Sequence, residues 1–209
     1  MDRSSAEILY HVTLIGESNT GKTQLCRAFK QDAFKGDYQP TIGCAMENVT
    51  FYSGECGKTI TVSFWDTAGT EKYNSLMKIY SRNSDLGLVV YDIANESSFN
   101  RIEYWKNQYE NSLSQDNNNN PSPIIIVGNK LDLRTNDHEV NQNFVAYQQL
   151  QDFATPLGCQ FHEVSAKTGE NVPNLLDMIK KILVRRKIQK TENLQLRDRA
   201  SSCFGNCSN

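Results

Sequence analysis

A pattern for binding phosphate lies near the N-terminus. The eight residues from Gly16 to Thr23 match G-x-x-x-x-G-K-[ST] between an apolar run and an amphipathic one, which is the strand-to-helix context that gives the pattern meaning. Glycines let the backbone curl so that N–H groups face a phosphate, while Lys22 neutralises charge on the β- and γ-phosphates and the Thr23 hydroxyl ligates Mg²⁺. The nucleotide-binding residues predicted in this segment are Ser18, Asn19, Thr20, Gly21, Lys22, Thr23 and Gln24.

A carboxylate follows a second apolar run. Asp66-Thr67-Ala68-Gly69 comes directly after residues 60–65, where proteins with this loop place a magnesium-binding aspartate. Asp66 is expected to hold Mg²⁺ through a water, and the Gly69 backbone N–H is expected to meet the γ-phosphate. An aspartate at a strand end before a glycine turn is common, so this interpretation depends on the loop at residues 16–23.

A third segment predicts which base is bound. Asn129-Lys130-Leu131-Asp132 follows the apolar run 124–127. The Asp132 carboxylate can accept from the N1–H and the 2-amino group of guanine, whereas adenine has a bare acceptor at N1 and would leave a buried charge unpaired. The stem of Lys130 is expected to lie along the base, and Asn129 is expected to tie this segment to the phosphate loop.

A short segment near the end of the sheet adds to this predicted base site. Ser165-Ala166-Lys167 follows the last strand candidate, and the backbone N–H of Ala166 is expected to donate to guanine O6. Three-residue patterns occur often by chance, so the segment on its own is equally well an ordinary turn.

These segments must be positioned by alternating strands and helices. Apolar runs punctuated by Gly, Asn, Asp and Pro alternate with amphipathic stretches, which is typical of βαβ units around a mostly parallel sheet. The glycine-containing turn at 53–57 joins two strands as an antiparallel hairpin. The expected strands are Leu9–Ile15, Met46–Tyr52, Ile60–Trp65, Leu86–Tyr91, Ile124–Val127 and Gln160–Val164, and helices are expected to begin near Gly21, Leu76, Ser98, Asn143 and Val172.

The last helix and the end of the chain differ in pattern. Apolar residues recur at helical spacing at Leu175, Leu176, Ile179, Ile182 and Leu183, which predicts one apolar stripe packed on the sheet. After about residue 190 the periodicity fades into Ser, Asn and Gly, which indicates a flexible tail. We therefore expect one α/β domain over residues 8–188 and a tail over residues 189–209.

Composition narrows the class of protein. A chain of 209 residues with 38% apolar content is long enough for one packed domain and too short for two. No window approaches the roughly eighteen apolar residues of a membrane span, and the N-terminus has no apolar signal stretch, so a cytosolic protein is expected. The six cysteines are scattered without CxxC pairs and are interpreted as free thiols.

Charge is distributed unevenly along the chain. From Lys180 onward eight basic and two acidic residues give a net charge of +6, and the fourteen basic and twenty-two acidic residues before it give −8. An acidic body with a basic end favours attraction to an anionic surface over nucleic-acid binding. A membrane is therefore the expected partner of the tail, and no nucleic-acid partner is expected.

The four motifs, in this order and spacing, resemble those of the Ras superfamily. Phe34 and the run Tyr38-Gln39-Pro40-Thr41-Ile42-Gly43 add to the resemblance, which spans about residues 10–183. Within the superfamily, the chain is most similar to the Rab branch of vesicle-traffic GTPases, on the evidence of Ile42-Gly43, of Trp65 to Gly69, and of Val90-Tyr91-Asp92-Ile93 followed by Ser97-Ser98-Phe99.

This resemblance implies a small G-protein fold of six strands, mostly parallel with one antiparallel hairpin strand, and helices on both faces. It implies that Phe34 packs edge-on against guanine and that Thr41 ligates Mg²⁺ and the γ-phosphate. Residues 34–46 and 68–82 would be the two switch segments that bind effectors, an exchange factor and a GTPase-activating protein. The implied nucleotide site also includes Tyr38, Gly69, Asn129, Lys130, Asp132, Ser165, Ala166 and Lys167.

The sequence departs from the family pattern in three places. Thr70 stands where the family usually has the glutamine that orients the attacking water. Residues 79–83 match the Rab pattern after the second switch only loosely. The end of the chain, residues 203–209, is neither a C-a-a-X box nor a pair of adjacent cysteines, although Cys203 and Cys207 are candidates for lipidation.

The expected function is a GTP- and GDP-dependent switch that uses Mg²⁺, regulates vesicle or membrane traffic, and attaches peripherally to the cytosolic face of an endomembrane. The predicted hydrolytic set is Lys22, Thr41, Gly69 and Thr70, and hydrolysis is expected to be slow. One alternative is an interaction module locked on GTP, favoured by Thr70. Another is a P-loop kinase for a small molecule, which is disfavoured by Asp132, by Ala166 and by the lack of sequence for a substrate lid.

Overall fold

The computed structural model describes residues 8–34, 36, 41–55, 57–69, 74–113, 122–134 and 144–186. Six strands form one sheet in the order β2-β3-β1-β4-β5-β6. The pairs β1–β3, β1–β4, β4–β5 and β5–β6 are parallel, and the β2–β3 pair is antiparallel, which confirms the predicted sheet. The strands are β1 (Ile8–Ile15), β2 (Cys44–Ser53), β3 (Lys58–Thr67), β4 (Leu86–Asp92), β5 (Ile124–Asn129) and β6 (Gln160–Glu163).

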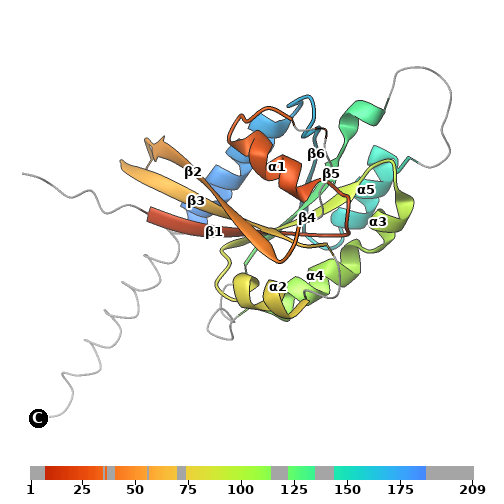
Figure 1. Ribbon diagram of the computed structural model, residues 1–209, viewed down its shortest axis with the longest axis horizontal. Coiled ribbons are helices and arrows are strands. Elements are labelled where there is room, and N and C mark those ends of the chain that lie inside the picture. The colour runs from red at the N-terminus through yellow and green to blue at the C-terminus, as the bar shows by residue number, and fades with distance from the viewer. Residues whose placement is uncertain are drawn as a thin grey trace, which may run out of the picture.

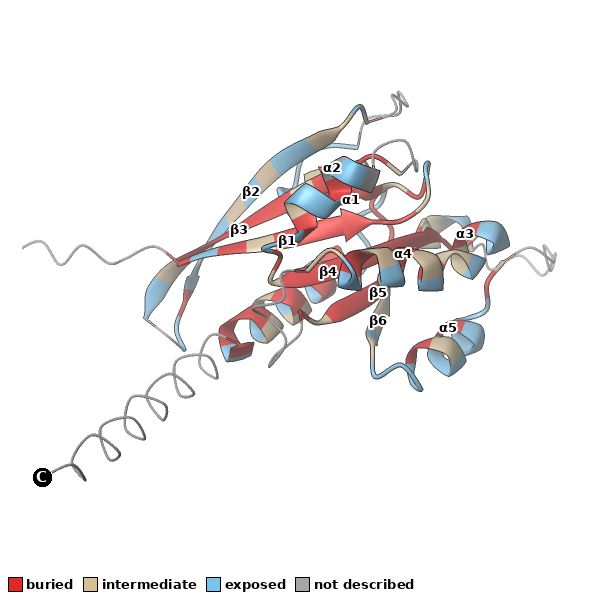
Figure 2. Ribbon diagram, turned by 90° about the horizontal axis from the view of Figure 1, so that it is seen from below, coloured by how far each residue is buried: buried red, intermediate tan, exposed pale blue. Residues whose placement is uncertain are grey.

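The central strands are apolar on both faces, and the edge strand is not. Every residue of β4 and β5 is buried, because strands covered by helices on both sides need continuous apolar runs. Strand β2 lies at the edge of the sheet, and all of its residues except Ser53 are partly or fully exposed (Figure 2). The other hairpin strand, β3, is mostly buried and contributes Ile60, Val62 and Phe64 to the core.

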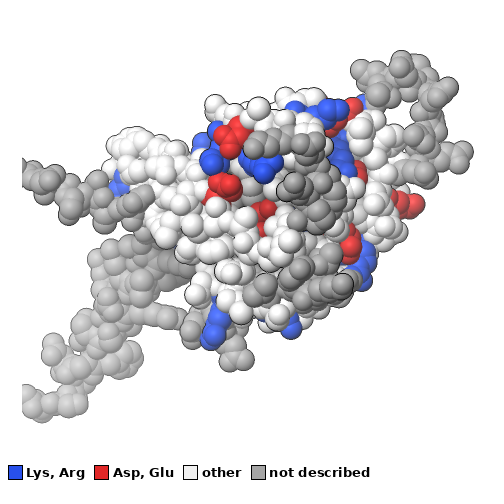
Figure 3. Space-filling view, in the orientation of Figure 1, with Lys and Arg blue, Asp and Glu red and all other residues white. Residues whose placement is uncertain are grey.

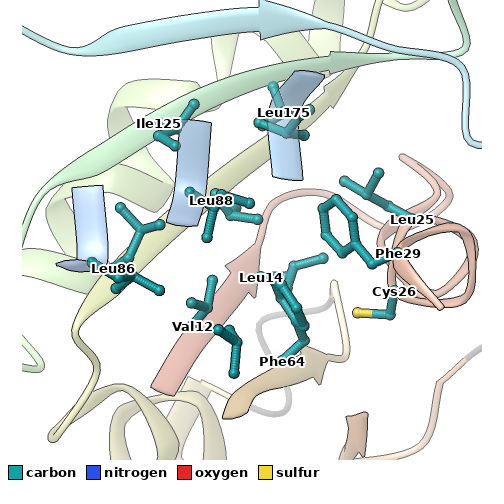
Figure 4. Packing of buried hydrophobic residues seen from close by; sticks show 14 of the residues in the cluster. Val12, Leu14, Leu25, Cys26, Phe29, Phe64, Leu86, Leu88, Ile125 and Leu175 are labelled. Atoms are coloured by element: carbon teal, nitrogen blue, oxygen red, sulfur yellow. The ribbon is translucent and has the colours of Figure 1, made fainter. Parts of the chain in front are cut away.

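Helices cover both faces of the sheet, as predicted (Figure 1). Helix α1 (Lys22–Phe29) and the C-terminal helix over residues 172–186 pack on one face. Their apolar side chains meet those of β1, β3 and β4 in one core, with Leu25 and Phe29 close to Leu14 and Phe64 (Figure 4). Of the predicted stripe on the last helix, Leu175, Ile179 and Leu183 are fully buried.

A second apolar core lies on the opposite face. It packs side chains of β4 and β5 against α2 (Asn74–Ser81), α4 (Ile102–Glu110) and α5 (Tyr147–Ala154). Trp105 and Tyr109 of α4 are among the largest fully buried side chains. The two cores hold the sheet rigid between layers of helix, so the loops at its edge have a fixed base.

Two helices differ from the sequence prediction. The helix expected from Ser98 begins earlier, as α3 (Glu96–Asn100), because the Asn95 side chain accepts from the backbone N–H groups of Ser97 and Ser98 and so caps it. It is then interrupted at Arg101, where α4 starts anew. The helix predicted from Asn143 begins at Tyr147, because the Val145 N–H donates to Ile93 O and holds that segment extended.

The predicted site residues follow the strands at one edge of the sheet. Gly16 comes after β1, Asp66 lies near the end of β3, Asn129 ends β5, and Ser165 comes shortly after β6. These strands are parallel to one another, so their carboxyl ends meet at the same edge, where open α/β sheets bind ligands.

Candidate functional site

The loop at residues 16–23 is shaped by close approaches of its backbone. Gly16 has a φ of +138°, and a Cβ there would lie 2.1 Å from the carbonyl oxygen of Val90. Gly21 has a φ of +88°, and a Cβ there would lie 2.3 Å from Asn129 Nδ2. Both positions therefore require glycine, and the loop curls tightly before α1 begins at Lys22.

Lys22 is held inside this loop. It is only 5% exposed, and its Nζ donates to Gly16 O at 2.8 Å and to Glu17 O at 2.7 Å. Burial lowers the pKa of Lys22 to about 8, although the charges of Asp66 and Glu17 act in the opposite direction. Burial thus disfavours the charged form of this amine, and the negative charge of bound phosphate oxygens would stabilise it again.

This lowered pKa predicts a pH dependence of nucleotide binding. Phosphates raise the pKa of Lys22, so binding favours the charged amine. Below about pH 8 the amine is already charged and the affinity is at its maximum, whereas above it binding takes up a proton and the affinity falls by up to roughly tenfold per pH unit. Calorimetric titrations of GDP in buffers of different ionisation enthalpy measure this uptake.

GMP is the control for this titration, because it carries the same base without the β-phosphate that Lys22 is expected to contact. We expect its affinity to change less with pH than that of GDP. Equal profiles for the two nucleotides, with no extra proton uptake by GDP, would contradict the assignment of Lys22.

Three oxygen-bearing side chains gather beside Lys22. Thr23 Oγ1 donates to Asp66 Oδ2 at 2.6 Å, and the hydroxyls of Thr23 and Thr41 lie 2.8 Å apart. Thr41 Oγ1 is also 3.3 Å from Asp66 Oδ2. The structure thus brings together the three residues predicted for the metal, from α1, from the segment before β2 and from β3.

The chemistry of this cluster fits Mg²⁺. Asp66 is 1% exposed, and its Oδ1 has no hydrogen-bond partner among the described residues. Burial raises the pKa of Asp66, while the bond from Thr23 and the charge of Lys22 lower it. Hydroxyl and carboxylate oxygens are hard ligands, and Mg²⁺ usually takes one or two carboxylates together with waters and substrate phosphates.

Gly69 lies against the phosphate loop. A Cβ at this position would be 2.5 Å from both the carbonyl carbon of Glu17 and the backbone nitrogen of Ser18. The neighbouring Ala68 N–H donates to Gly43 O at 3.0 Å, so the start of the second predicted switch segment is joined to the last part of the first. Any side chain at Gly69 would push this segment away from the loop.

Asn129 joins the base segment to the phosphate loop, as predicted. Its Nδ2 donates to Thr20 O at 2.9 Å, and its Oδ1 accepts from the Ala166 N–H at 3.0 Å. The Ala166 N–H, expected to donate to guanine O6, donates in this structure to Asn129, because the buried asparagine lies between the two loops. One side chain therefore fixes three segments relative to one another.

Asp132 and Lys130 also have partners within the protein. Asp132 Oδ1 accepts from Ser165 Oγ at 2.6 Å, and Asp132 Oδ2 lies 3.4 Å from Lys167 Nζ. Lys130 has a left-handed backbone with φ of +70°, and its Nζ lies 2.7 Å from Asp92 Oδ2. Ser165 and Lys167 thus orient the carboxylate that is predicted to read the base.

Arg134, which no sequence motif singles out, holds the base segment in place. Its guanidinium donates to both oxygens of Glu163, at 2.6 and 2.8 Å, and also to Val145 O at 2.8 Å. This pair fixes the turn after Asp132 to the end of β6. The sequence shows a basic residue just after the Asn-Lys-Leu-Asp segment, but it does not show which carboxylate that residue binds.

The remaining predicted residues differ in how far the structure describes them. Ser18 and Asn19 are exposed, Thr20 is buried, and Phe34 is 45% exposed. Four of the predicted residues lie outside the described residues, namely Tyr38, Thr70, Cys203 and Cys207. The tail boundary at residue 188 is likewise outside them.

A phosphate loop whose tight backbone depends on Gly16 and Gly21, placed at the edge of a mostly parallel sheet, defines a P-loop nucleotide-binding protein. The model of the Ras family matches residues 11–185. The Ras-related protein RabC of Dictyostelium discoideum is 35% identical over 173 residues, which cover 83% of each chain. Two proteins of Saccharomyces cerevisiae are also similar: GTP-binding protein YPT53 is 36% identical over 82% of this chain and 76% of its own, and GTP-binding protein YPT52 is 31% identical over 81% and 80%.

The chain therefore belongs to the Ras family. Its Rab and Ypt relatives identify it as a Rab-like small GTPase, the kind of switch that acts in vesicle traffic. Proteins of this family bind GTP, GDP and Mg²⁺, hydrolyse GTP, and work with effectors, exchange factors and GTPase-activating proteins. The P-loop kinase is thereby excluded.

Proposed function

We propose that this chain is a slow GTPase switch whose nucleotide site consists of the residues predicted above. The observation that supports it most is the convergence of Lys22, Thr23, Thr41 and Asp66 on one side of the phosphate loop. Asn129 joins that loop to the segment that carries Asp132. The residues for phosphate binding and those for base selection thus lie at the same edge of the sheet and are held together by Asn129.

Each residue in this site has a separate task. Lys22 holds positive charge at the β- and γ-phosphates, and Thr23 with Asp66 positions the metal. Mg²⁺, when bound, neutralises charge that develops on the phosphates. Gly69 presents its backbone N–H to the γ-phosphate, and Asp132 accepts from the guanine edge. Catalysis here is mainly positioning and electrostatic stabilisation.

The two nucleotide states are expected to present different protein surfaces to binding partners. Thr41 and Gly69 lie in separate segments, and each is expected to gain a partner when a γ-phosphate is present. Hydrolysis removes that partner and releases both segments. Residues 34–46 and 68–82 would accordingly bind effectors, the exchange factor and the GTPase-activating protein in a state-dependent way.

Single-turnover hydrolysis by the isolated protein tests this proposal. The protein is loaded with GTP, the appearance of GDP and phosphate is followed over time, and the bound fraction is measured in parallel. Slow conversion of bound GTP to GDP supports the proposal. Bound GTP that never turns over would instead identify an interaction module locked on GTP.

Thr70 gives a prediction about the rate. A threonine is two heavy-atom positions shorter than glutamine and has a single hydroxyl in place of the two separate polar atoms of an amide, so it cannot reach the attacking water and the phosphoryl group at the same time. The change Thr70→Gln is expected to accelerate single-turnover hydrolysis about tenfold or more. Equal rates at equal GTP and Mg²⁺ occupancy would show that Thr70 does not limit hydrolysis.

The tail is proposed to attach the protein peripherally to the cytosolic face of an endomembrane. Among the described helices, none has the length and apolar character that a bilayer crossing requires. Cys203 and Cys207 follow a segment with a net charge of +6. Two lipid chains, or one chain with a basic patch, give stable anchoring where one chain alone is marginal.

Losing both cysteines is expected to move the protein from the membrane fraction to the soluble fraction. The measurement is fractionation of cells that express either the wild type or the double change Cys203→Ser and Cys207→Ser, with intact masses of both. The matched control is Cys159→Ser, since Cys159 lies in the folded domain just before β6. A soluble wild-type protein with no added lipid mass would rule out this attachment.

A further inference from the structure

The phosphate loop contains an acidic residue, although a negative charge close to bound phosphates is unfavourable. Glu17 directly follows Gly16, in a loop that is built to bind phosphate. Its Oε1 accepts from Arg101 Nε at 2.9 Å and from Trp105 Nε1 at 3.0 Å. These partners lie 84 and 88 residues away in sequence. Arg101 lies between α3 and α4, and Trp105 lies within α4.

The two donors are themselves firmly placed. Trp105 is 1% exposed in the core beneath α4, and a buried indole N–H needs an acceptor. The Arg101 guanidinium carbon lies 3.9 Å from the centre of the Tyr104 ring, so the arginine is stacked as well as paired. The Glu17 carboxylate is therefore drawn toward α4 and neutralised there.

The backbone of Glu17 carries contacts of the nucleotide site. Its carbonyl accepts from Lys22 Nζ at 2.7 Å and from Thr20 Oγ1 at 3.0 Å. The same peptide unit forms the surface that Gly69 approaches most closely. Moving Glu17 would therefore displace the lysine of the phosphate site and the segment that is expected to meet the γ-phosphate.

We propose that Arg101 and Trp105 are positioning residues that hold Glu17, and through it the phosphate loop, in the geometry that binds the β- and γ-phosphates. This inference rests on the proposed function of the same site. The Arg101 guanidinium neutralises the one carboxylate of the loop, and the Trp105 N–H donates to the same carboxylate oxygen. Together they hold the residue whose carbonyl is one of the two that accept from Lys22. The break between α3 and α4 places Arg101 beside the loop.

The ratio of GDP affinity to GMP affinity tests the proposal. GMP keeps the base and the α-phosphate but lacks the phosphate that the loop is expected to hold. Arg101→Ala is expected to weaken GDP about tenfold, the scale of one charge-assisted hydrogen bond, and to leave GMP affinity nearly unchanged. Arg101→Lys, which keeps the charge, is expected to recover part of the loss.

Two further variants make the result decisive. Lys106→Ala is the matched control, because Lys106 pairs with Glu110 on the same helix at 2.7 Å and has no part in the loop. Trp105→Phe removes the indole N–H and keeps an aromatic ring, and it carries the test if Arg101→Ala does not fold. An equal loss for GDP and GMP, or no loss for either, would overturn the proposal. Failure of the wild type to bind GDP would overturn the proposed function instead.

Discussion

Changing Asp132 to asparagine is expected to lower the affinity for GTP by on the order of 10³-fold and to favour xanthosine triphosphate. The carboxylate accepts from two guanine donors in the proposed complex, whereas an amide NH₂ would face those donors. Xanthine presents a 2-oxo group that accepts the amide proton. Because an amide oxygen can still accept from Ser165 Oγ, which lies 2.6 Å from Asp132 Oδ1, the base segment should keep its shape.

Competition binding of GTP and xanthosine triphosphate to the wild type and the variant measures this change. Asp177→Asn is the matched control, because its side chain is 64% exposed on the C-terminal helix and pairs with Lys180, three residues further along the same helix. The control should bind GTP like the wild type. Unchanged GTP affinity in the Asp132 variant would refute the role given to this residue.

The second large effect is expected at the metal. Changing Asp66 to asparagine should lower the apparent Mg²⁺ affinity of the nucleotide complex by roughly 10- to 100-fold, the range seen when groups that orient metal ligands are lost. Asparagine replaces one carboxylate oxygen by an NH₂ group that cannot accept a hydrogen bond, and it removes the negative charge beside the metal. GDP release, followed by fluorescence across an Mg²⁺ titration, measures the shift.

Folding stability separates this effect from general damage. Burial raises the pKa of Asp66, so the folded state disfavours the carboxylate at neutral pH, and a neutral asparagine relieves that cost. The nucleotide-free variant should accordingly unfold no earlier than the wild type. Asp152→Asn, at an exposed position of α5, should change neither property. An Asp66 variant with unaltered Mg²⁺ dependence would contradict the metal site.

Sequence periodicity was enough for the sheet and for most of the candidate site. The buried runs of β4 and β5 and the short turn after β2 admit few arrangements, because parallel strands need helical crossovers and a tight turn forces a hairpin. Because the motifs follow parallel strands, they then lie together at one edge of the sheet. This explains why Thr23 and Asp66, far apart in sequence, could be paired in advance.

Contacts between distant side chains could not be predicted in this way. The helix break at Arg101 has no glycine or proline to mark it. The start of α5 depends on a bond from Val145 to Ile93 O, and the acceptor of the Ala166 N–H depends on where the Asn129 side chain lies. Local propensity carries no information about such pairs, because they form only when the tertiary structure brings them together.

Titration of the full chain with nucleotides tests directly whether the protein is a guanine-nucleotide switch that depends on Mg²⁺. The nucleotide-free protein is titrated with GDP, GTP, ADP and ATP, each with Mg²⁺ and with a chelator. A guanine-nucleotide switch built on Lys22, Asp66 and Asp132 should bind GDP and GTP tightly in Mg²⁺, bind them more weakly in chelator, and discriminate strongly against both adenine nucleotides. Equal binding of ATP and GTP, or affinities that do not respond to Mg²⁺, would contradict it.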